Sequence, residues 1–409
     1  MPEKQTMVLV GASMVGSSAA RALRSLGFDG RIILVGQERE LPYDRPPLSK
    51  EYLKGEMERE KLFLLPSNFY SENDIELELG VRVARIDPQS SKVELENGKS
   101  IAYDRVLIGT GGHVRKVEVP GADLEGIYYL RTLEDSDAIA AELKPGRRCV
   151  VIGAGFIGAE IAASARMKGV EVTMLEIAPV PMGRALSEDV GKIYAEIHRE
   201  HGVDLRLNDG IERFEGEKRV QRVVGTSGQT VECDFVVVGV GIVPETNLVE
   251  GTGIETGNGI MVNEYCETNA PGVYAAGDVA NFYSAFLGER VRLEHWSNAQ
   301  NQAAAAAKNM LGEREVYIDV PWFWSDQYDI NLQLIGHPRN WDQVVFRGNV
   351  EERRFTVFYL KDGGLQAALA LNRGGDIRPC REVIKAGIPV DPQQLQDEGV
   401  NLRTLVPRG

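Results

Sequence analysis

Two segments of the chain follow the same pattern of an apolar strand, a glycine-rich turn and a helix-like stretch. They are residues 7–16, MVLVGASMVG, and residues 149–158, CVVIGAGFIG. In this pattern the first glycine makes a tight turn, the second lets the backbone approach a pyrophosphate, and the third lets the helix pack on the strand. One such turn can arise by chance. Two copies in matching contexts predict two dinucleotide sites, and a chain with two such sites is expected to pass electrons between dinucleotides.

The first copy predicts strand 7–11, a helix over about residues 14–27 and strand 31–36. Its turn departs from the pattern because Ser13 stands at the second glycine position. A serine can still present its backbone N–H, but its side chain must turn away or donate to a phosphate. The residues expected at this phosphate are Gly11, Ser13, Met14, Val15 and Gly16.

The position that reads a ribose, after strand 31–36, holds Gln37 followed by Glu38. A carboxylate is preferred there because it accepts hydrogen bonds from both ribose hydroxyls. Gln37 could do so more weakly, and Glu38 could substitute for it. An ordinary polar loop is the alternative for each residue.

The second copy is more regular, with strand 148–153, a helix and strand 170–176. Glu176 ends the second of these strands, where an acid hydrogen-bonds the 2′-hydroxyl of an adenosine ribose and would repel a 2′-phosphate. The pattern therefore favours NADH over NADPH, although Arg184 could serve a 2′-phosphate. The residues expected at the phosphate are Gly153, Gly155, Phe156, Ile157 and Gly158.

Each copy is followed by a meander of short alternating strands. Residues 81–111 and residues 217–243 both end in an apolar strand and a glycine turn, Gly109-Thr110-Gly111 and Gly239-Val240-Gly241. The repeat thus covers a whole domain plan, a parallel sheet with helices on one face and a meander on the other. Thr110 and Gly111 are assigned to the first nucleotide site and Gly241 to the second.

Composition suits a chain of two or three domains, since it has 409 residues and a net charge of −14. No apolar run approaches the roughly 20 residues that cross a bilayer, and MPEKQTM lacks the apolar core of a signal peptide. The negative charge argues against nucleic acid and anionic membranes as partners. The four cysteines are scattered without metal-ligand spacing, so no metal is expected; Cys149 is predicted to be a buried thiol in a reducing cytoplasm.

Five further segments identify a family resemblance. TNAPGVYAAGD fits the T-x6-A-x-G-D pattern of FAD-dependent pyridine nucleotide reductases, and the other four resemble the ferredoxin reductases of bacterial oxygenase systems, the group of putidaredoxin, rhodocoxin and biphenyl-dioxygenase reductases. The resemblance spans essentially the whole chain. The segments are 42–50 (PYDRPPLSK), 130–135 (LRTLED), 268–278 (TNAPGVYAAGD), 296–302 (WSNAQNQ) and 321–328 (PWFWSDQY).

The resemblance implies an α/β fold like that of glutathione reductase, with two Rossmann-like three-layer nucleotide-binding domains and a C-terminal α+β domain. The implied division is a discontinuous FAD domain (1–114 and 242–319), an NAD domain (115–241) and an interface domain (320–409). It also implies a cytoplasmic monomer or weak homodimer that passes a hydride from NADH to FAD. Single electrons would then reach a two-iron ferredoxin, of Rieske or four-cysteine type, serving an oxygenase of aromatic hydrocarbon catabolism.

In the family the lysine of PPLSK lies beside flavin N5, which here is Lys50. Its expected partner is Glu160, and the pair would join the two nucleotide domains; a solvated loop lysine is the alternative for Lys50. Asp278 would bind the ribityl–phosphate side of FAD, and the helix beginning at Trp296 would direct its positive end at the flavin. Further residues assigned to FAD by resemblance are Arg45, Val83, Arg131 and Gly277.

The chain has no cysteine before Cys149, so the thiol relay of related disulfide reductases is excluded. Electrons must leave the flavin directly, and the resemblance selects a one-electron carrier as acceptor. Two alternatives stay open, a flavoprotein oxidase or quinone reductase and a non-enzymatic protein like apoptosis-inducing factor.

The third domain is predicted to hold strands QVVFRG, RFTVFYL and LQAALALN, a helix RPCREVIKAG and a terminal helical segment over 391–405. An acidic ferredoxin would need a local basic or apolar patch, for which two arginine-rich clusters are candidates; a salt-bridged surface is the alternative. The final LVPRG resembles a protease-site remnant, or is a native end. The clusters are Arg353, Arg354 and Lys361, and Arg373, Arg378 and Arg381.

Overall fold

The computed structural model describes residues 4–284 and 286–406 of the chain. These fall into two compact units, each assembled from segments that are far apart in sequence. The expectations for MPE and for the end of LVPRG lie outside the described residues, and the three-domain boundaries stay a prediction. The first unit comprises Met1–Asp44, Leu62–His113 and Val243–Phe323, and the second comprises Arg45–Lys61, Val114–Ile242 and Trp324–Gly409.

A five-stranded parallel sheet with the order β20-β7-β1-β2-β3 forms the core of the first unit. Its register pairs Leu9 with Leu34 on one side and with Leu107 on the other. All three side chains are buried, as expected for a parallel sheet covered on both faces. The strands are β1 (Thr6–Val10), β2 (Arg31–Gly36), β3 (Ile75–Leu79), β7 (Arg105–Ile108) and β20 (Val273–Ala275).

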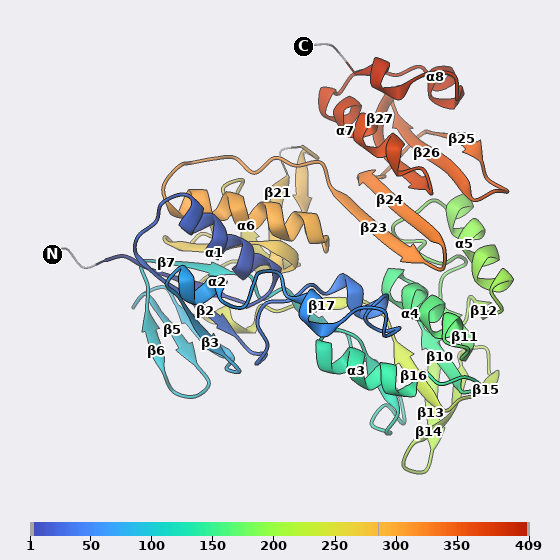
Figure 1. Ribbon diagram of the computed structural model, residues 1–409, viewed down its shortest axis with the longest axis horizontal. Helices are drawn as coiled ribbons and strands as arrows, with labels where there is room; N and C mark the ends of the chain where they lie inside the picture. The colour runs from blue at the N-terminus through green and yellow to red at the C-terminus, as the bar shows by residue number, and fades with distance from the viewer. Residues whose placement is uncertain (1–3, 285, 407–409) are drawn as a thin grey trace. The chain divides into compact units, whose positions relative to one another are not determined.

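Two helices from distant parts of the sequence pack against each other in this unit, α1 (Met14–Ser25) and α6 (Trp296–Met310), drawn in blue and orange in Figure 1. Both bury small side chains, such as Ala19 on α1 and Ala303 and Ala306 on α6. Small residues allow a short distance between helix axes, which explains the alanine run of α6.

Two smaller sheets complete the first unit, the predicted meander β4-β5-β6 and a sheet with the order β18-β19-β21-β22. The sequence had indicated no strands for the second of these, because strands of two to five residues show too little alternation. The elements are β4 (Val83–Asp87), β5 (Lys92–Leu95), β6 (Ser100–Ala102), β18 (Thr256–Gly257), β19 (Gly259–Val262), β21 (Ala280–Ser284), β22 (Glu289–Val291), α2 (Phe69–Glu72), η3 (Asn247–Val249) and η4 (Gly277–Val279).

The second unit repeats this plan with a parallel sheet of order β12-β11-β10-β16-β9 and a meander β13-β14-β15. The meander begins at Ile211, before the predicted residue 217, because β13 precedes the turn after Gly216. The elements are β9 (Ile127–Tyr129), β10 (Arg148–Ile152), β11 (Glu171–Glu176), β12 (Asp204–Leu207), β13 (Ile211–Gly216), β14 (Val220–Gly225), β15 (Thr230–Glu232), β16 (Phe235–Val238), α3 (Leu133–Glu142), α4 (Phe156–Met167) and α5 (Glu188–Glu200).

The C-terminal part of this unit is a sheet of order β23-β24-β27-β26-β25 with α7 packed on it. The single terminal helical segment predicted for 391–405 is two short helices, α8 and η6. The buried Arg347 guanidinium donates to the carbonyl of residue 395 in α8 and to those of residues 397, 398 and 400 between α8 and η6, which holds this connection out of a helix. The elements are β23 (Trp322–Gln327), β24 (Ile330–Gly336), β25 (Gln343–Asn349), β26 (Arg354–Lys361), β27 (Gly364–Leu371), η5 (Gly374–Asp376), α7 (Ile377–Ala386), α8 (Pro392–Gln396) and η6 (Leu402–Leu405).

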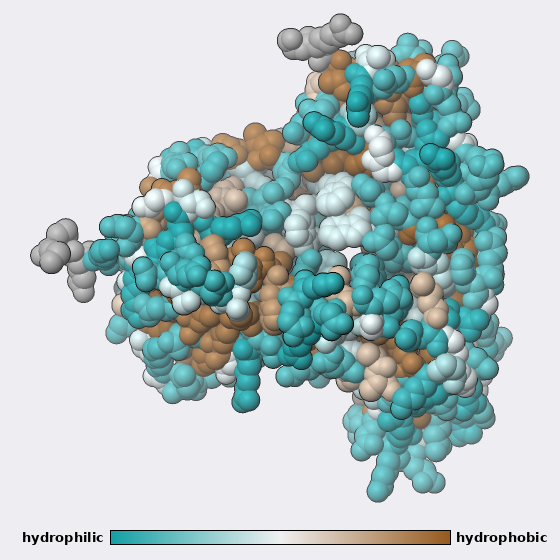
Figure 2. Space-filling view, viewed as in Figure 1, coloured by the Kyte–Doolittle hydropathy of each residue, from teal (hydrophilic) through white to brown (hydrophobic). Residues whose placement is uncertain are grey.

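The remaining elements are a two-stranded ribbon and two short 3-10 helices. The face seen in Figure 2 is mostly hydrophilic, in keeping with the charge of −14. Across 4–284 and 286–406, no helix combines the length and apolarity needed to span a membrane. The elements are β8 (Gly112–Val114), β17 (Ile242–Pro244), η1 (Pro46–Ser49) and η2 (Arg59–Leu62).

Candidate functional site

The first glycine turn is closed by backbone contacts that leave no room for a side chain. Gly11 has a φ of +112°, and a Cβ on it would lie 2.2 Å from the carbonyl oxygen of Gly109. A Cβ on Gly16 would lie 2.3 Å from the carbonyl oxygen of Gly11. Both positions therefore require glycine, and the turn feeds directly into α1.

The start of α1 can accept an anion. Ser13 is its N-cap residue, but no side chain among the described residues caps this end, and its first turn holds no acidic residue. Backbone N–H groups at an uncapped helix start bind phosphate and similar groups. Ser13 and Met14 are partly exposed here, whereas Val15 is buried. The structure thus brings the predicted phosphate-binding residues together at one helix end.

The AAGD motif lies beside this helix start. Gly277 has a φ of +76°, and a Cβ on it would lie 2.6 Å from Cγ2 of Val15. Asp278 follows in η4 and is partly exposed, while its carbonyl accepts a hydrogen bond from the Arg292 guanidinium at 3.1 Å. Two segments far apart in sequence therefore meet at the same place.

The ribose-reading positions of the first turn differ in their surroundings. Glu38 accepts a hydrogen bond from the Tyr43 hydroxyl, so part of its carboxylate is engaged within the protein. Gln37 is exposed at the end of β2. Both residues lie at the strand end that the pattern assigns to a ribose.

Four more residues predicted for the first site lie in this unit. The Thr110 hydroxyl donates to the carbonyl of Glu245 at 3.0 Å, and the Trp296 indole N–H donates to Oδ1 of Asp44 at 2.7 Å. Gly111 has a φ of +65°, which accounts for glycine there. Val83 is buried at the start of β4.

The second glycine turn has the same backbone contacts with one open position. A Cβ on Gly153 would lie 2.6 Å from the carbonyl oxygen of Gly239, and one on Gly158 would lie 2.0 Å from that of Gly153. A Cβ on Gly155 would meet no atom within 4 Å. Gly155 is also the N-cap residue of α4, and no described side chain caps it. Glycine at 155 therefore preserves free space at an anion-binding helix end.

Glu176 reaches back from the end of β11 to this turn. Its Oε2 accepts from the backbone N–H of Ala154 at 2.6 Å, and its Oε1 accepts from that of Ala178 at 2.8 Å. The carboxylate is thus held at the edge of the turn. Among the other residues predicted for this site, Ile157 is 45% exposed, Phe156 is partly buried, and Arg184 and Gly241 are exposed.

The predicted partners Lys50 and Glu160 form a buried ion pair. Lys50 Nζ lies 3.0 Å from Glu160 Oε2, and their side chains are only 8% and 4% exposed. A solvated loop lysine is therefore excluded. Both residues belong to the second unit, so the pair fixes segment 45–61 to α4; the expectation that it joins two separate domains does not match this division.

Buried serines that the sequence analysis missed hold this segment and the Glu160 carboxylate. The Ser49 hydroxyl donates to Glu160 Oε2 at 2.5 Å, and the Ser325 hydroxyl donates to Oε1 at 2.7 Å. Ser136 and Ser164 donate to the carbonyls of Leu48 and Ser49 at 2.8 and 2.7 Å. A single serine within an apolar helix was the available signal for Ser164, and Ser325 lies inside PWFWSDQY.

Arg45 and Arg131 also meet within the second unit, where the Arg45 guanidinium donates to the backbone carbonyl of Arg131. Of the residues predicted for the first nucleotide site, Arg45, Lys50 and Arg131 belong to the second unit. The other residues predicted for that site belong to the first unit.

The four cysteines are all buried, which confirms the prediction for Cys149. Burial raises the pKa of Cys233 and of Cys266 to about 12, and it raises the pKa of Cys149 and of Cys380 as well. None of these thiols is prepared for thiolate chemistry. Among the described residues, no group of three or more His, Cys, Asp or Glu could hold a metal ion.

Comparison with known proteins gives matches over the full chain. Residues 5–303 match the pyridine nucleotide-disulphide oxidoreductase family, and residues 322–406 match the reductase C-terminal family. The chain is 38% identical to rhodocoxin reductase of Rhodococcus erythropolis, covering 98% of this chain and 95% of that protein. It is 39% identical to the ferredoxin–NAD(+) reductase component of the anthranilate 1,2-dioxygenase system of Burkholderia cepacia, covering 98% of both.

A solved structure agrees with these matches. The reductase in the covalent putidaredoxin reductase–putidaredoxin complex has a TM-score of 0.96 and 35% identity, with 98% of each chain covered. With two glycine turns, an adjoining AAGD motif and a matching C-terminal domain, the chain belongs to the pyridine nucleotide-disulphide oxidoreductase family, within its group of ferredoxin reductases.

Proposed function

We propose that this chain takes a hydride from NADH and delivers single electrons to a two-iron ferredoxin that serves an oxygenase. As a member of its family, it is an oxidoreductase whose cofactors are FAD and NAD(H). The observation that carries the proposal is the buried Lys50–Glu160 pair, found on a chain with two anion-binding helix starts. FAD would accept the hydride from the nicotinamide and release the electrons one at a time.

The first unit fits FAD. Its glycine turn leaves the backbone N–H groups of α1 available to a pyrophosphate, and Asp278 lies beside that helix start. Glu38 would be the carboxylate that accepts from a ribose hydroxyl, since an ionised carboxylate can accept several hydrogen bonds. The Ser13 hydroxyl would donate to a phosphate.

The second unit fits NADH. The space above Gly155 allows a pyrophosphate to approach the backbone, and Glu176 stands at the strand end where it would accept from a ribose hydroxyl. The same carboxylate disfavours a 2′-phosphate by charge repulsion. Exposed Arg184 is the residue that would oppose this preference.

Lys50 would hold a positive charge beside flavin N5, and Glu160 would hold Lys50 in place. A buried ammonium stabilises negative charge that develops on a bound group, because little solvent screens it. The Glu160 carboxylate satisfies Lys50 without exposing it to water. Arg45 and Arg131 belong to the same unit as Lys50.

Electrons would leave the flavin without a thiol relay. The chain contains no cysteine before Cys149, and all four thiols are buried. This separates the chain from the disulfide reductases that give the family its name. A one-electron carrier remains as the acceptor that the relatives support, since the solved relative is joined to putidaredoxin.

The ferredoxin would be of the Rieske or four-cysteine type, and the chain would work in the cytoplasm as a monomer or weak dimer. The relatives named for anthranilate and dehydrodivanillate systems support a role in aromatic catabolism. Of the candidate docking arginines, Arg353 pairs with Glu196 and Glu200, and Arg373 pairs with Asp376 and Glu398. Exposed Arg354 and Arg378 are better candidates for docking an acidic partner.

The test is anaerobic stopped-flow reduction of the purified flavoprotein, followed by electron transfer to a two-iron ferredoxin. Heat-released flavin should be FAD, and NADH should reduce it. Lys50→Met should slow this reduction by about tenfold or more, the worth of one charge-assisted contact. Release of FMN would contradict the first-site assignment. If Lys50→Met is reduced at the parent rate, the assignment of Lys50 to the flavin site is wrong. Rapid NADH-driven oxygen consumption with no electron transfer to ferredoxin would favour an oxidase.

A further inference from the structure

A chain of buried hydrogen bonds continues from the second oxygen of Glu160 into the C-terminal domain. Ser325 Oγ lies 2.7 Å from Glu160 Oε1, and Gln327 Nε2 lies 3.2 Å from Ser325 Oγ. Gln327 Oε1 lies 3.0 Å from His198 Nε2, and His198 Nδ1 lies 3.0 Å from the Tyr328 hydroxyl. Ser325, Gln327 and His198 are 0–1% exposed. All of these residues belong to the second unit.

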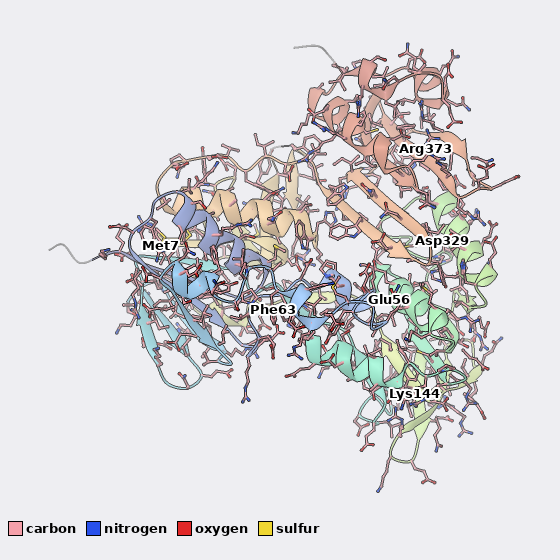
Figure 3. All side chains as sticks on the ribbon, in the orientation of Figure 1. Met7, Glu56, Phe63, Lys144, Asp329 and Arg373 are labelled. Carbon is pink, nitrogen blue, oxygen red and sulfur yellow. The ribbon has the colours of Figure 1, made fainter. Side chains whose placement is uncertain are left out.

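Two elements supply this chain. Ser325 and Gln327 point to the same face of β23 because side chains two apart in a strand share a face. The strand runs into the turn where Figure 3 labels Asp329, between β23 and β24. His198 comes from the last turn of α5. The chain therefore ties β23 and α5 to Glu160 on α4.

The carboxylate sets the direction of every bond in the chain. Glu160, as the anionic partner of Lys50, only accepts, so Ser325 must donate to it. Ser325 then accepts from the Gln327 amide nitrogen, which leaves the Gln327 oxygen to accept from His198 Nε2–H. His198 Nδ1 is consequently the acceptor for the Tyr328 hydroxyl. One charge thus determines an amide orientation and a histidine tautomer.

We infer that Ser325, Gln327 and His198 are positioning residues for Glu160, and through it for Lys50. With Oε1 held by Ser325, the carboxylate presents Oε2 to Lys50 and Ser49. Charge-assisted hydrogen bonds are short and directional, so the second contact prevents rotation of the carboxylate. The inference rests on the proposed placement of Lys50 beside the flavin. It makes β23 of the C-terminal domain part of the hydride-transfer site.

The histidine is neutral in this arrangement. Burial lowers the pKa of His198 to about 4, with the Gln327 hydrogen bond acting in the opposite direction and the nearby His201 adding to the lowering. The Tyr328 ring stacks on His201 at 3.7 Å, which holds the outer end of the chain. A neutral imidazole donates from one nitrogen and accepts at the other, as the directed chain requires.

The first arm of the test reads the tautomer by NMR of the FAD-containing protein labelled with 15N-histidine. One histidine, identified by its loss in His198→Asn, should carry its proton on Nε2 with Nδ1 unprotonated from about pH 5 to 8, where an ordinary histidine titrates. Tyr328→Phe should shift the Nδ1 signal, because that nitrogen loses its donor. A proton on Nδ1, or a charged ring at neutral pH, overturns the directed chain.

The second arm measures flavin reduction by NADH in Ser325→Ala and Gln327→Leu. The flavin of each variant should be reduced about tenfold more slowly at saturating NADH, because the buried Glu160 carboxylate loses its Ser325 donor or that donor loses its Gln327 contact. The apparent Kd for NADH should change by less than about threefold, since ground-state binding is not the contact removed. Ser325→Thr keeps the hydroxyl and should restore the rate. Tyr359→Phe is the matched control, because it removes the buried hydrogen bond to Ser187 in the same unit, outside the chain.

The two arms separate this inference from the proposed function. If Lys50→Met slows flavin reduction but Ser325→Ala and Gln327→Leu do not, the positioning role is wrong and the Lys50 assignment stands. If the flavin of Lys50→Met is reduced at the parent rate, the Lys50 assignment is wrong. The proposed role of the hydrogen-bond chain in hydride transfer is then wrong as well. If Ser325→Ala does not fold, Gln327→Leu and the Tyr328→Phe spectrum decide. Equal slowing by Tyr359→Phe would show a general packing effect and overturn the inference.

Discussion

The two glycine turns make the same backbone contacts but differ at the positions that a ligand would contact. In both, Cβ atoms on the first and third glycines would collide with carbonyl oxygens at 2.0–2.6 Å. At the middle position the first turn has Ser13, whereas the second has Gly155 with free space above it. Packing therefore requires glycine at the first and third positions of both turns. The middle position and the residue at the strand end are not constrained in this way and can differ between two ligands.

The strand ends show the same contrast. Glu176 binds the N–H of Ala154 in its own glycine turn, so its carboxylate is held where a ribose would lie. Glu38 binds the Tyr43 hydroxyl outside its turn. Under the proposed function, the second site would have a fixed acid to discriminate between coenzymes, and the first would offer a less regular polar edge to its prosthetic group.

The largest effect on stability is expected from a side chain added at a glycine that packing requires. Gly158→Ala should destabilise the protein by about 3 kcal/mol, the upper end for overpacking, because its Cβ would overlap a backbone carbonyl that cannot change rotamer. Gly155→Ala should leave the melting temperature unchanged and weaken NADH binding. Thermal unfolding and NADH titration separate the two. Equal stability losses in both variants would contradict the assignment of Gly155 to the ligand.

A pH effect should be specific to the second unit. Folded His198 has a pKa of about 4, and an unfolded histidine has one of about 6.5, so the unfolded state binds more protons between these values. Stability should therefore be unaffected above about pH 6.5 and should fall by about 2–3 kcal/mol towards pH 4. Melting temperatures measured from neutral to acid pH should fall more steeply in the parent than in His198→Asn. His113→Asn, at an exposed site of the first unit, is the control and should match the parent.

Coenzyme choice sharpens the strand-end comparison. The parent should use NADH with a kcat/KM at least about tenfold above that for NADPH, the worth of a charged hydrogen bond plus phosphate repulsion. Glu176→Ala should reduce this ratio mainly through KM for NADH. Glu171→Ala, at the opposite end of β11, is the matched control. Equal use of both coenzymes by the parent would show that Arg184 or another cation dominates.

The smallest effect is expected from the thiols. Replacing all four cysteines with serine or alanine should leave NADH-to-ferredoxin turnover largely intact, apart from stability losses at these buried positions, Cys149 among them. Separate measurement of flavin reduction and of ferredoxin reduction tests this. A cysteine-free protein whose flavin is reduced normally but which cannot reduce ferredoxin would show that a thiol lies on the exit route.

The sequence by itself determined the repeated units, both glycine turns and the meanders. Turn chemistry and strand patterns are local, so a few adjacent residues carry each signal. The family resemblance supplied the ion pair, whose partners are far apart along the chain. The short strands β18–β22 carried too little pattern to be predicted.

Only the tertiary structure decided what surrounds Glu160. Ser49, Ser325 and His198 come from three distant segments. Ser49 and Ser325 lie inside segments that carry the family resemblance, but no local pattern shows that all three residues converge around Glu160. Their roles depend on burial, where a carboxylate must satisfy both oxygens from whatever donors the fold brings near. The same holds for segment 45–61, whose serine contacts place it with the second unit although the sequence neighbours on both sides belong to the first. Backbone turns can be read from adjacent residues, but the partners of a buried charge are set by packing.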